Sequence, residues 1–87
     1  MPEPWTVIIT PRADKDMRHI AADHAQRVTE ALKGMQANPY QGDVRRLEGK
    51  LPGWRRRVGE WRIRFVVDED ARAVVVLRVL PRGSAYD

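Results

Sequence analysis

The chain has 87 residues, no cysteine and a net charge of +4. This length fits one domain, residues 1–87, with a small core. The absence of cysteine excludes disulfides and thiolate metal sites. The first residues lack the basic start and apolar run of a signal peptide, and no apolar stretch approaches the ~20 residues that span a bilayer. We therefore expect a cytoplasmic protein without a membrane partner.

The positive charge is concentrated in residues 45–64. This window holds eight lysines and arginines and two acids, which gives it a charge of +6 and leaves −2 for the rest of the chain. A scattered basic excess is typical of a solubilising surface, whereas a local one is typical of a surface that binds a polyanion. The distribution favours nucleic acid as a partner.

The first half of the chain predicts one strand and two helices. Residues 5–9 alternate and are rich in β-formers, as in a strand. Thr10-Pro11 is a helix start, and the spacing of apolar residues after it predicts about three turns. Asp23 is a candidate cap for a second helix, which we expect to end at Asn38-Pro39. The core stripe of this second helix is Val28, Ala31, Leu32 and Met35.

The second half predicts three strands. Residues 39–53 are expected to be irregular, with Leu47 as an anchor to the core. Strands follow at 54–58 and 61–68, joined by a tight turn at Gly59-Glu60, and the apolar run 74–80 predicts a central last strand. The fold class is therefore α+β: an N-terminal strand, an α-helical hairpin and then antiparallel strands, with the hairpin covering one face of the sheet.

Alternation along the two paired strands separates their side chains onto two faces. Trp61, Ile63 and Phe65 belong to the apolar face. We expect the opposite, open face to carry four projecting arginines, namely Arg55, Arg57, Arg62 and Arg64. Arg56 falls in phase with the apolar residues of its strand, which indicates a strand edge or a bulge.

The sequence resembles the RelE/ParE superfamily of type II toxins over nearly its whole length. The specific parts are the segment Trp-Arg-Arg-Arg-Val-Gly-Glu-Trp-Arg at 54–62 and the closing pair Arg82 and Tyr86. Asn38-Pro39 and Leu47-Glu48-Gly49 are similar as well. The resemblance implies a RelE-like microbial RNase fold and a toxin that a cognate antitoxin neutralises.

RelE-like members cleave mRNA in the ribosomal A site without a metal or other cofactor, so the resemblance implies an endoribonuclease (mRNA interferase). Matched by position, the catalytic candidates are Arg55, Arg57, Arg62, Arg82 and Tyr86. The candidates for RNA binding are Arg45, Arg46, Lys50, Arg56 and Arg64. The expected partners are mRNA on the ribosome and an acidic antitoxin segment that folds on binding.

Two departures from the RelE pattern leave alternatives open. RelE has lysines at the positions of Arg55 and Arg57, and many relatives have histidine where this chain has Pro81. Tyr86 is then the best candidate for the general base, although it could instead stack on a base, and Arg82 is a candidate for the weak acid. Orientation of the RNA by the arginines is another possibility. ParE-like inhibition of DNA gyrase and an inactive module that binds only antitoxin are the competing functions.

The other polar residues give no strong signal. Asp14, Asp16 and Asp23 fit a solvated helix surface, and no metal site is expected. His19 and His24 lie in the predicted helical hairpin, remote from the arginines.

Overall fold

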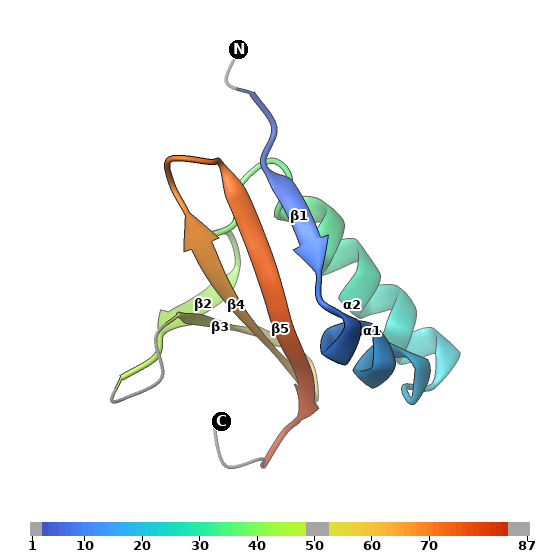
Figure 1. Ribbon diagram of the computed structural model, residues 1–87. Coiled ribbons are helices and arrows are strands. Elements are labelled where there is room, and N and C mark those ends of the chain that lie inside the picture. The colour runs from blue at the N-terminus through green and yellow to red at the C-terminus, as the bar shows by residue number, and fades with distance from the viewer. Residues whose placement is uncertain (1–2, 49–52, 84–87) are drawn as a thin grey trace.

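The computed structural model describes residues 3–48 and 53–83 (Figure 1). These residues form two helices and a five-stranded sheet of order β1-β5-β4-β3-β2. Only the β1–β5 pair is parallel. The predicted α+β fold is confirmed, and no helix in this part of the chain is long and apolar enough to cross a membrane. The elements are β1 (Thr6–Ile9), α1 (Pro11–Arg18), α2 (Ala22–Gly34), β2 (Asp43–Arg46), β3 (Trp54–Val58), β4 (Trp61–Asp68) and β5 (Ala73–Pro81).

Thr10 joins the first strand to both a helix and the sheet. Its hydroxyl accepts a hydrogen bond from the Ala13 N–H at 3.3 Å, as expected of an N-cap, and donates one to the Val76 carbonyl at 2.7 Å. α1 has eight residues and makes about two turns rather than three. It is shorter because the chain leaves the helix at His19, which lets Ile20 turn into the core.

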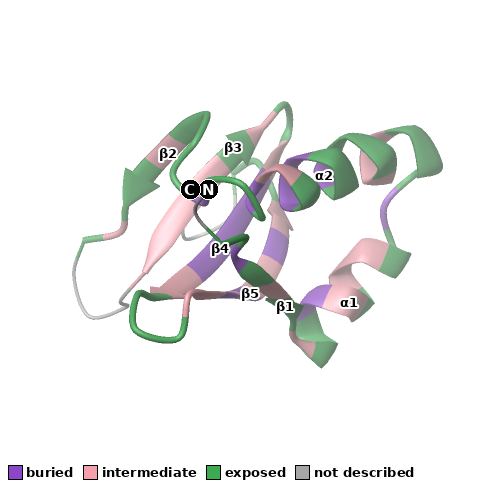
Figure 2. Cartoon of the chain, turned by 90° about the horizontal axis from the view of Figure 1, so that it is seen from above, coloured by how far each residue is buried: buried purple, intermediate pink, exposed green. Residues whose placement is uncertain are grey.

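The bounds of α2 differ from the prediction at both ends. Ala21 is the N-cap, and Asp23 lies in the first turn, where the helix dipole favours a carboxylate. The helix ends at Gly34, four residues before Asn38, because glycine is a weak helix former and turns follow it. The predicted stripe of α2 is nevertheless buried against β4 and β5 (Figure 2).

β2 lies inside the segment predicted to be irregular. It is an edge strand that pairs with β3, and Val44 packs against the core while Leu47 is only half-buried. A single apolar residue among Asp43, Val44, Arg45 and Arg46 gives no alternation that could be recognised. The predicted bounds of β3 and β4 are confirmed, and β5 lies between β1 and β4, which confirms its central position.

α1 occupies the edge of β5 that β1 leaves uncovered. β1 pairs with β5 only as far as Val76. Beyond that point the Asp16 carboxylate accepts hydrogen bonds from the Val79 N–H at 2.9 Å and from the Arg78 guanidinium at 2.8 and 3.2 Å. Asp16 was expected on a solvated surface, but its side chain is only 14% exposed. It is buried because it satisfies a strand N–H that has no strand partner.

The same contacts set the pKa of Asp16. Burial raises this pKa, but the hydrogen bonds from Arg78 and Val79 and the charges of Arg78 and Arg12 together outweigh burial. The pKa of Asp16 is therefore lower than its ordinary value of 3.8.

Asp16→Asn is expected to lower the free energy of unfolding at neutral pH by about 1–2 kcal/mol, because hydrogen bonds to a charged group are removed. Since the folded-state pKa is lowered, this stabilisation is complete above 3.8 and disappears as pH falls through the folded-state value. Urea unfolding over a pH series measures it. The control is Asp14→Asn, which removes an exposed ion pair with Arg18 and should cost less than about 0.5 kcal/mol. Equal stability of wild type and Asp16→Asn at neutral pH contradicts this account.

Gly53 sets the backbone path into β3. Its φ is +119°, and a Cβ at this position would lie 2.7 Å from the Phe65 carbonyl oxygen, a backbone atom of the central strand β4. Gly53→Ala should therefore destabilise the protein by about 2 kcal/mol or more. Gly34→Ala is the matched control, since a Cβ there meets nothing within 4 Å and helix propensity favours alanine. Thermal unfolding should show a lower Tm for the first variant and an equal or higher Tm for the second, and the reverse order would refute the assignment.

Candidate functional site

One face of the sheet carries arginines on three adjacent strands. The pairing register places Arg45 of β2 opposite Arg55 of β3, and Arg55 opposite Arg64 of β4. Two residues along, Arg57 of β3 lies opposite Arg62 of β4. Side chains of directly opposed residues share a face. We call this set the arginine face; its members are Arg45, Arg55, Arg57, Arg62 and Arg64.

The arrangement places like charges directly opposite one another. Such cross-strand pairs destabilise a sheet, by a few tenths of a kcal/mol up to about 1 kcal/mol each. An acid at the edge offsets part of the charge, since Asp43 lies opposite Arg57 and its carboxylate is 3.7 Å from the Arg55 guanidinium. The balance remains strongly positive, which suits a ligand that supplies several negative charges.

We expected Arg62 and Arg64 to project into solvent, and this prediction is wrong. Only 5% and 8% of their surface is exposed. They belong to β4, so the strands on either side flank their side chains, and the sheet twists strongly between β5 and β3 (Figure 1). The Arg62 guanidinium donates to the carbonyls of Gly59 at 3.0 Å and Trp61 at 3.1 Å. In the cross-strand pair of Arg57 with Arg62, Arg57 is the exposed member. The face therefore combines a guanidinium held by backbone carbonyls, that of Arg62, with the exposed guanidiniums of Arg45 and Arg57.

Arg82 joins this end of the arginine face through the β3–β4 turn. Its backbone N–H donates to the Glu60 carbonyl at 2.6 Å, and its guanidinium lies 3.9 Å from the Glu60 carboxylate. Arg62 is tied to the preceding residue of the same turn, Gly59. The turn therefore brings Arg57, Arg62 and Arg82 to one end of the site. Tyr86 and Lys50, the other predicted site residues, lie outside the described residues.

The structure separates Arg46 and Arg56 from the arginine face. Both alternate onto the opposite side of the sheet, where Arg56 pairs with Ile63 and Arg46 pairs with Trp54. β3 is an internal strand with unbroken register, so neither a strand edge nor a bulge accounts for Arg56. Its guanidinium instead packs over Gly42, where a Cβ would lie 2.9 Å from the Arg56 Cζ.

Arg46 contacts an aromatic side chain. Its guanidinium lies 5.9 Å from the ring centroid of Trp54, within the range of a cation–π contact.

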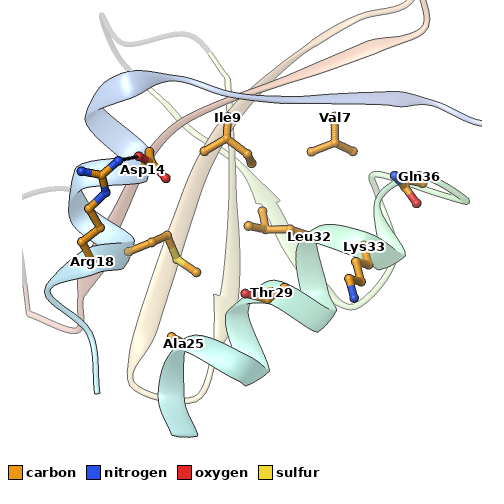
Figure 3. A pocket seen from close by; sticks show the side chains of 10 residues that line it. Val7, Ile9, Asp14, Arg18, Ala25, Thr29, Leu32, Lys33 and Gln36 are labelled. Carbon is orange, nitrogen blue, oxygen red and sulfur yellow. Dashed lines mark hydrogen bonds and ion pairs between the residues drawn. The ribbon is translucent and has the colours of Figure 1, made fainter. Parts of the chain in front are cut away.

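Sequence reasoning missed an apolar groove between β1 and the two helices (Figure 3). Its volume is about 510 Å³, and it is bordered by β1, whose Ile8 and Ile9 are 46% and 37% exposed. Exposed isoleucines are typical of an edge strand, but their exposure is visible only in the structure. Nothing in the sequence predicts that β1 lies at the edge of the sheet. The groove is lined by Val7, Ile9, Asp14, Met17, Arg18, Ala25, Thr29, Leu32, Lys33 and Gln36.

Comparison with known proteins agrees with this architecture. A family model described as the ParE toxin of the type II toxin–antitoxin system parDE matches residues 7–86. A RelE1 protein from Methanocaldococcus jannaschii is 27% identical over 85 residues, 94% of each chain. The RelE–RelB complex from Pyrococcus horikoshii contains a chain that is 26% identical with a TM-score of 0.82, covering 94% of this chain and 99% of that one. The RelBE2 toxin–antitoxin complex from Mycobacterium tuberculosis gives 27% identity and a TM-score of 0.82 over 91% and 99%.

A family match over nearly the whole chain, supported by the similar folds, identifies this protein as a member of the ParE toxin family of type II toxin–antitoxin systems, within the RelE/ParE superfamily.

Proposed function

We propose that this toxin is a ribosome-dependent endoribonuclease that cleaves mRNA in the A site by attack of the RNA 2′-OH, without a metal. The observation that carries the proposal is the pairing of like charges on the arginine face, Arg55 with Arg64 and Arg57 with Arg62. A sheet gains nothing from such pairs by itself. A phosphodiester backbone offsets their repulsion, and guanidinium forks match its oxygens.

The cleavage reaction has three requirements: deprotonation of the 2′-OH, stabilisation of charge on the phosphate and protonation of the leaving 5′-oxygen. Arg57, Arg62 and Arg55 would perform the second task. Arg62 suits it because its position is set before RNA binds, by the Gly59 and Trp61 carbonyls. We assign Arg82 to the leaving oxygen and Tyr86 to the 2′-OH proton.

An antitoxin is the second partner that we propose. The related P. horikoshii and M. tuberculosis structures are toxin–antitoxin complexes. An acidic segment that folds on binding would match the charge of the arginine face, and its apolar side chains would match the groove beside β1. We place both partners in the cytoplasm, where ribosomes are found.

A primer-extension assay on translated mRNA tests the nuclease. Wild type is expected to cut at A-site codons only when ribosomes are present. Arg57→Ala, Arg62→Ala, Arg82→Ala and Tyr86→Ala should each lower the cleavage rate by about 10²–10³-fold, the usual cost of removing one stabilising donor. Lys33→Ala, which removes an exposed charge of α2 beside the groove near β1, is the control and should cleave as wild type does. Intact mRNA at growth-arresting concentrations contradicts the proposal.

The ParE description of the matching family model favours a second candidate, inhibition of DNA gyrase. Arginine at 55 and 57, where RelE has lysine, agrees with it as well. Growth arrest with intact mRNA, DNA-damage signalling and persistence of toxicity after Arg82→Ala and Tyr86→Ala would select this function. If expression of the protein does not arrest growth but the protein still binds antitoxin, the chain is an inactive module that only binds antitoxin.

If the arginine face serves RNA, removing one of its charges should stabilise the free protein. Arg57→Gln relieves the repulsion with Arg62 but also removes the attraction of Asp43, which lies opposite Arg57 in β2. The free energy of unfolding is therefore expected to rise by only a few tenths of a kcal/mol. The gain should shrink as salt screens the charges. Lys33→Gln, at an exposed position of α2, provides the charge-matched control. Urea unfolding at low and high salt measures both variants, and destabilisation by Arg57→Gln at low salt would show that Arg57 serves the fold instead.

A further inference from the structure

A second cavity, of about 400 Å³, lies between α1 and the C-terminal half of β5. It is separate from the groove in Figure 3 and shares none of its lining residues. It is lined by Arg12, Lys15, Asp16, His19, Ile20, Trp61, Arg78, Val79, Leu80 and Pro81. The mechanism proposed above uses none of these residues.

The rim of this cavity is basic. Arg12, Lys15 and His19 follow one another at helical spacings of three and four, so they lie on one side of α1. The carboxylate in the lining, Asp16, is held by Arg78 and the Val79 N–H. Among the residues that the structure describes, no carboxylate lies within ion-pair distance of Arg12 or Lys15. Arg12 acts on Asp16 through its charge but without an ion-pair contact, so the donors of both cations can still bind a ligand.

The floor of the cavity is apolar and reaches the arginine face only through Leu80 of β5. Ile20, Trp61 and Val79 supply the part of the floor on the helix side of the sheet. Leu80 lies directly opposite Arg62 in the β4–β5 pairing, and Pro81 immediately precedes Arg82. The cavity thus begins one strand away from the end of the site where Arg57, Arg62 and Arg82 meet. Neighbouring strands are about 4.8 Å apart, so a chain lying on the arginine face can continue over Leu80 into it.

We propose that this cavity is a subsite for one nucleotide of a single-stranded RNA whose adjoining backbone lies on the arginine face. Arg12 and Lys15 hold its phosphate, and the apolar floor receives its base or ribose. The inference rests on the proposed function, because it extends the same RNA beyond the arginines. It adds α1 to the RNA-binding surface. It also gives a reason why Arg12, Lys15 and His19 border an apolar cavity.

The test is equilibrium binding of a fluorescent single-stranded RNA of about 10 nucleotides, within the usual range of site sizes. Its 2′-hydroxyls are replaced by fluorine so that it cannot be cleaved. Binding is measured by anisotropy across a salt series, without ribosomes or antitoxin. The Arg12→Gln/Lys15→Gln variant is compared with Arg18→Gln/Lys33→Gln, which removes the same number of charges from exposed residues that line the separate groove of Figure 3. Thermal unfolding confirms that both variants fold.

The subsite predicts that Arg12→Gln/Lys15→Gln weakens binding at least about 10-fold. It also predicts that the slope of log K against log salt falls by about 0.7 for each phosphate that the variant no longer neutralises. The control variant should keep the wild-type slope. Equal weakening in the two variants would mean that only long-range charge acts, and would overturn the subsite.

The same assay separates failure of the subsite from failure of the proposed function. Arg55→Gln/Arg57→Gln reports on the arginine face. If this variant binds weakly while Arg12→Gln/Lys15→Gln binds as wild type, the subsite is wrong and the proposed function stands. If wild type does not bind the RNA, the subsite is overturned, and the proposed function is decided by the primer-extension assay with ribosomes.

Discussion

The candidate site depends on the register of the β3–β4 hairpin. The Gly59-Glu60 turn fixes that register, so Arg57 lies opposite Arg62 and Arg55 opposite Arg64. A slip of one residue would send Arg55 and Arg57 to the helix side of the sheet and Arg56 to the open side. The turn also carries the carbonyls that hold Arg62 and the Arg82 backbone. One short segment therefore sets both the spacing of the charges and the position of the C-terminal arginine.

The two sides of the sheet perform different tasks. On one side, α2 and the apolar residues of β4 and β5 form a buried core, which the 87-residue chain needs in order to fold. On the other side, like charges oppose one another at a cost in stability. The Asp16 contacts with Arg78 and Val79 close the free edge of β5 and offset part of that cost. Under the proposed function, stability and RNA binding compete at the arginine face, as is common where binding needs strained or repulsive groups.

The sequence predicted the features that local patterns determine. Alternation in β3 and β4 gave their bounds and placed Arg55, Arg57, Arg62 and Arg64 on a common face, and helical spacing gave the core stripe of α2. Features that depend on tertiary contacts were missed. β2 has one apolar residue and forms because β3 offers a partner. Asp16 is buried because the pairing of β1 with β5 stops at Val76. Burial of Arg62 follows from the central position of β4, which no local pattern reveals.

The most direct test of the account is a structure of the toxin bound to a ribosome that carries an uncleavable mRNA. The account predicts that the A-site codon crosses β3 and β4, with its phosphates in hydrogen-bond contact with Arg57 and Arg62 and with Arg82 beside the scissile 5′-oxygen. Binding with the arginine face turned away from the mRNA, or no binding to the A site at all, would contradict it.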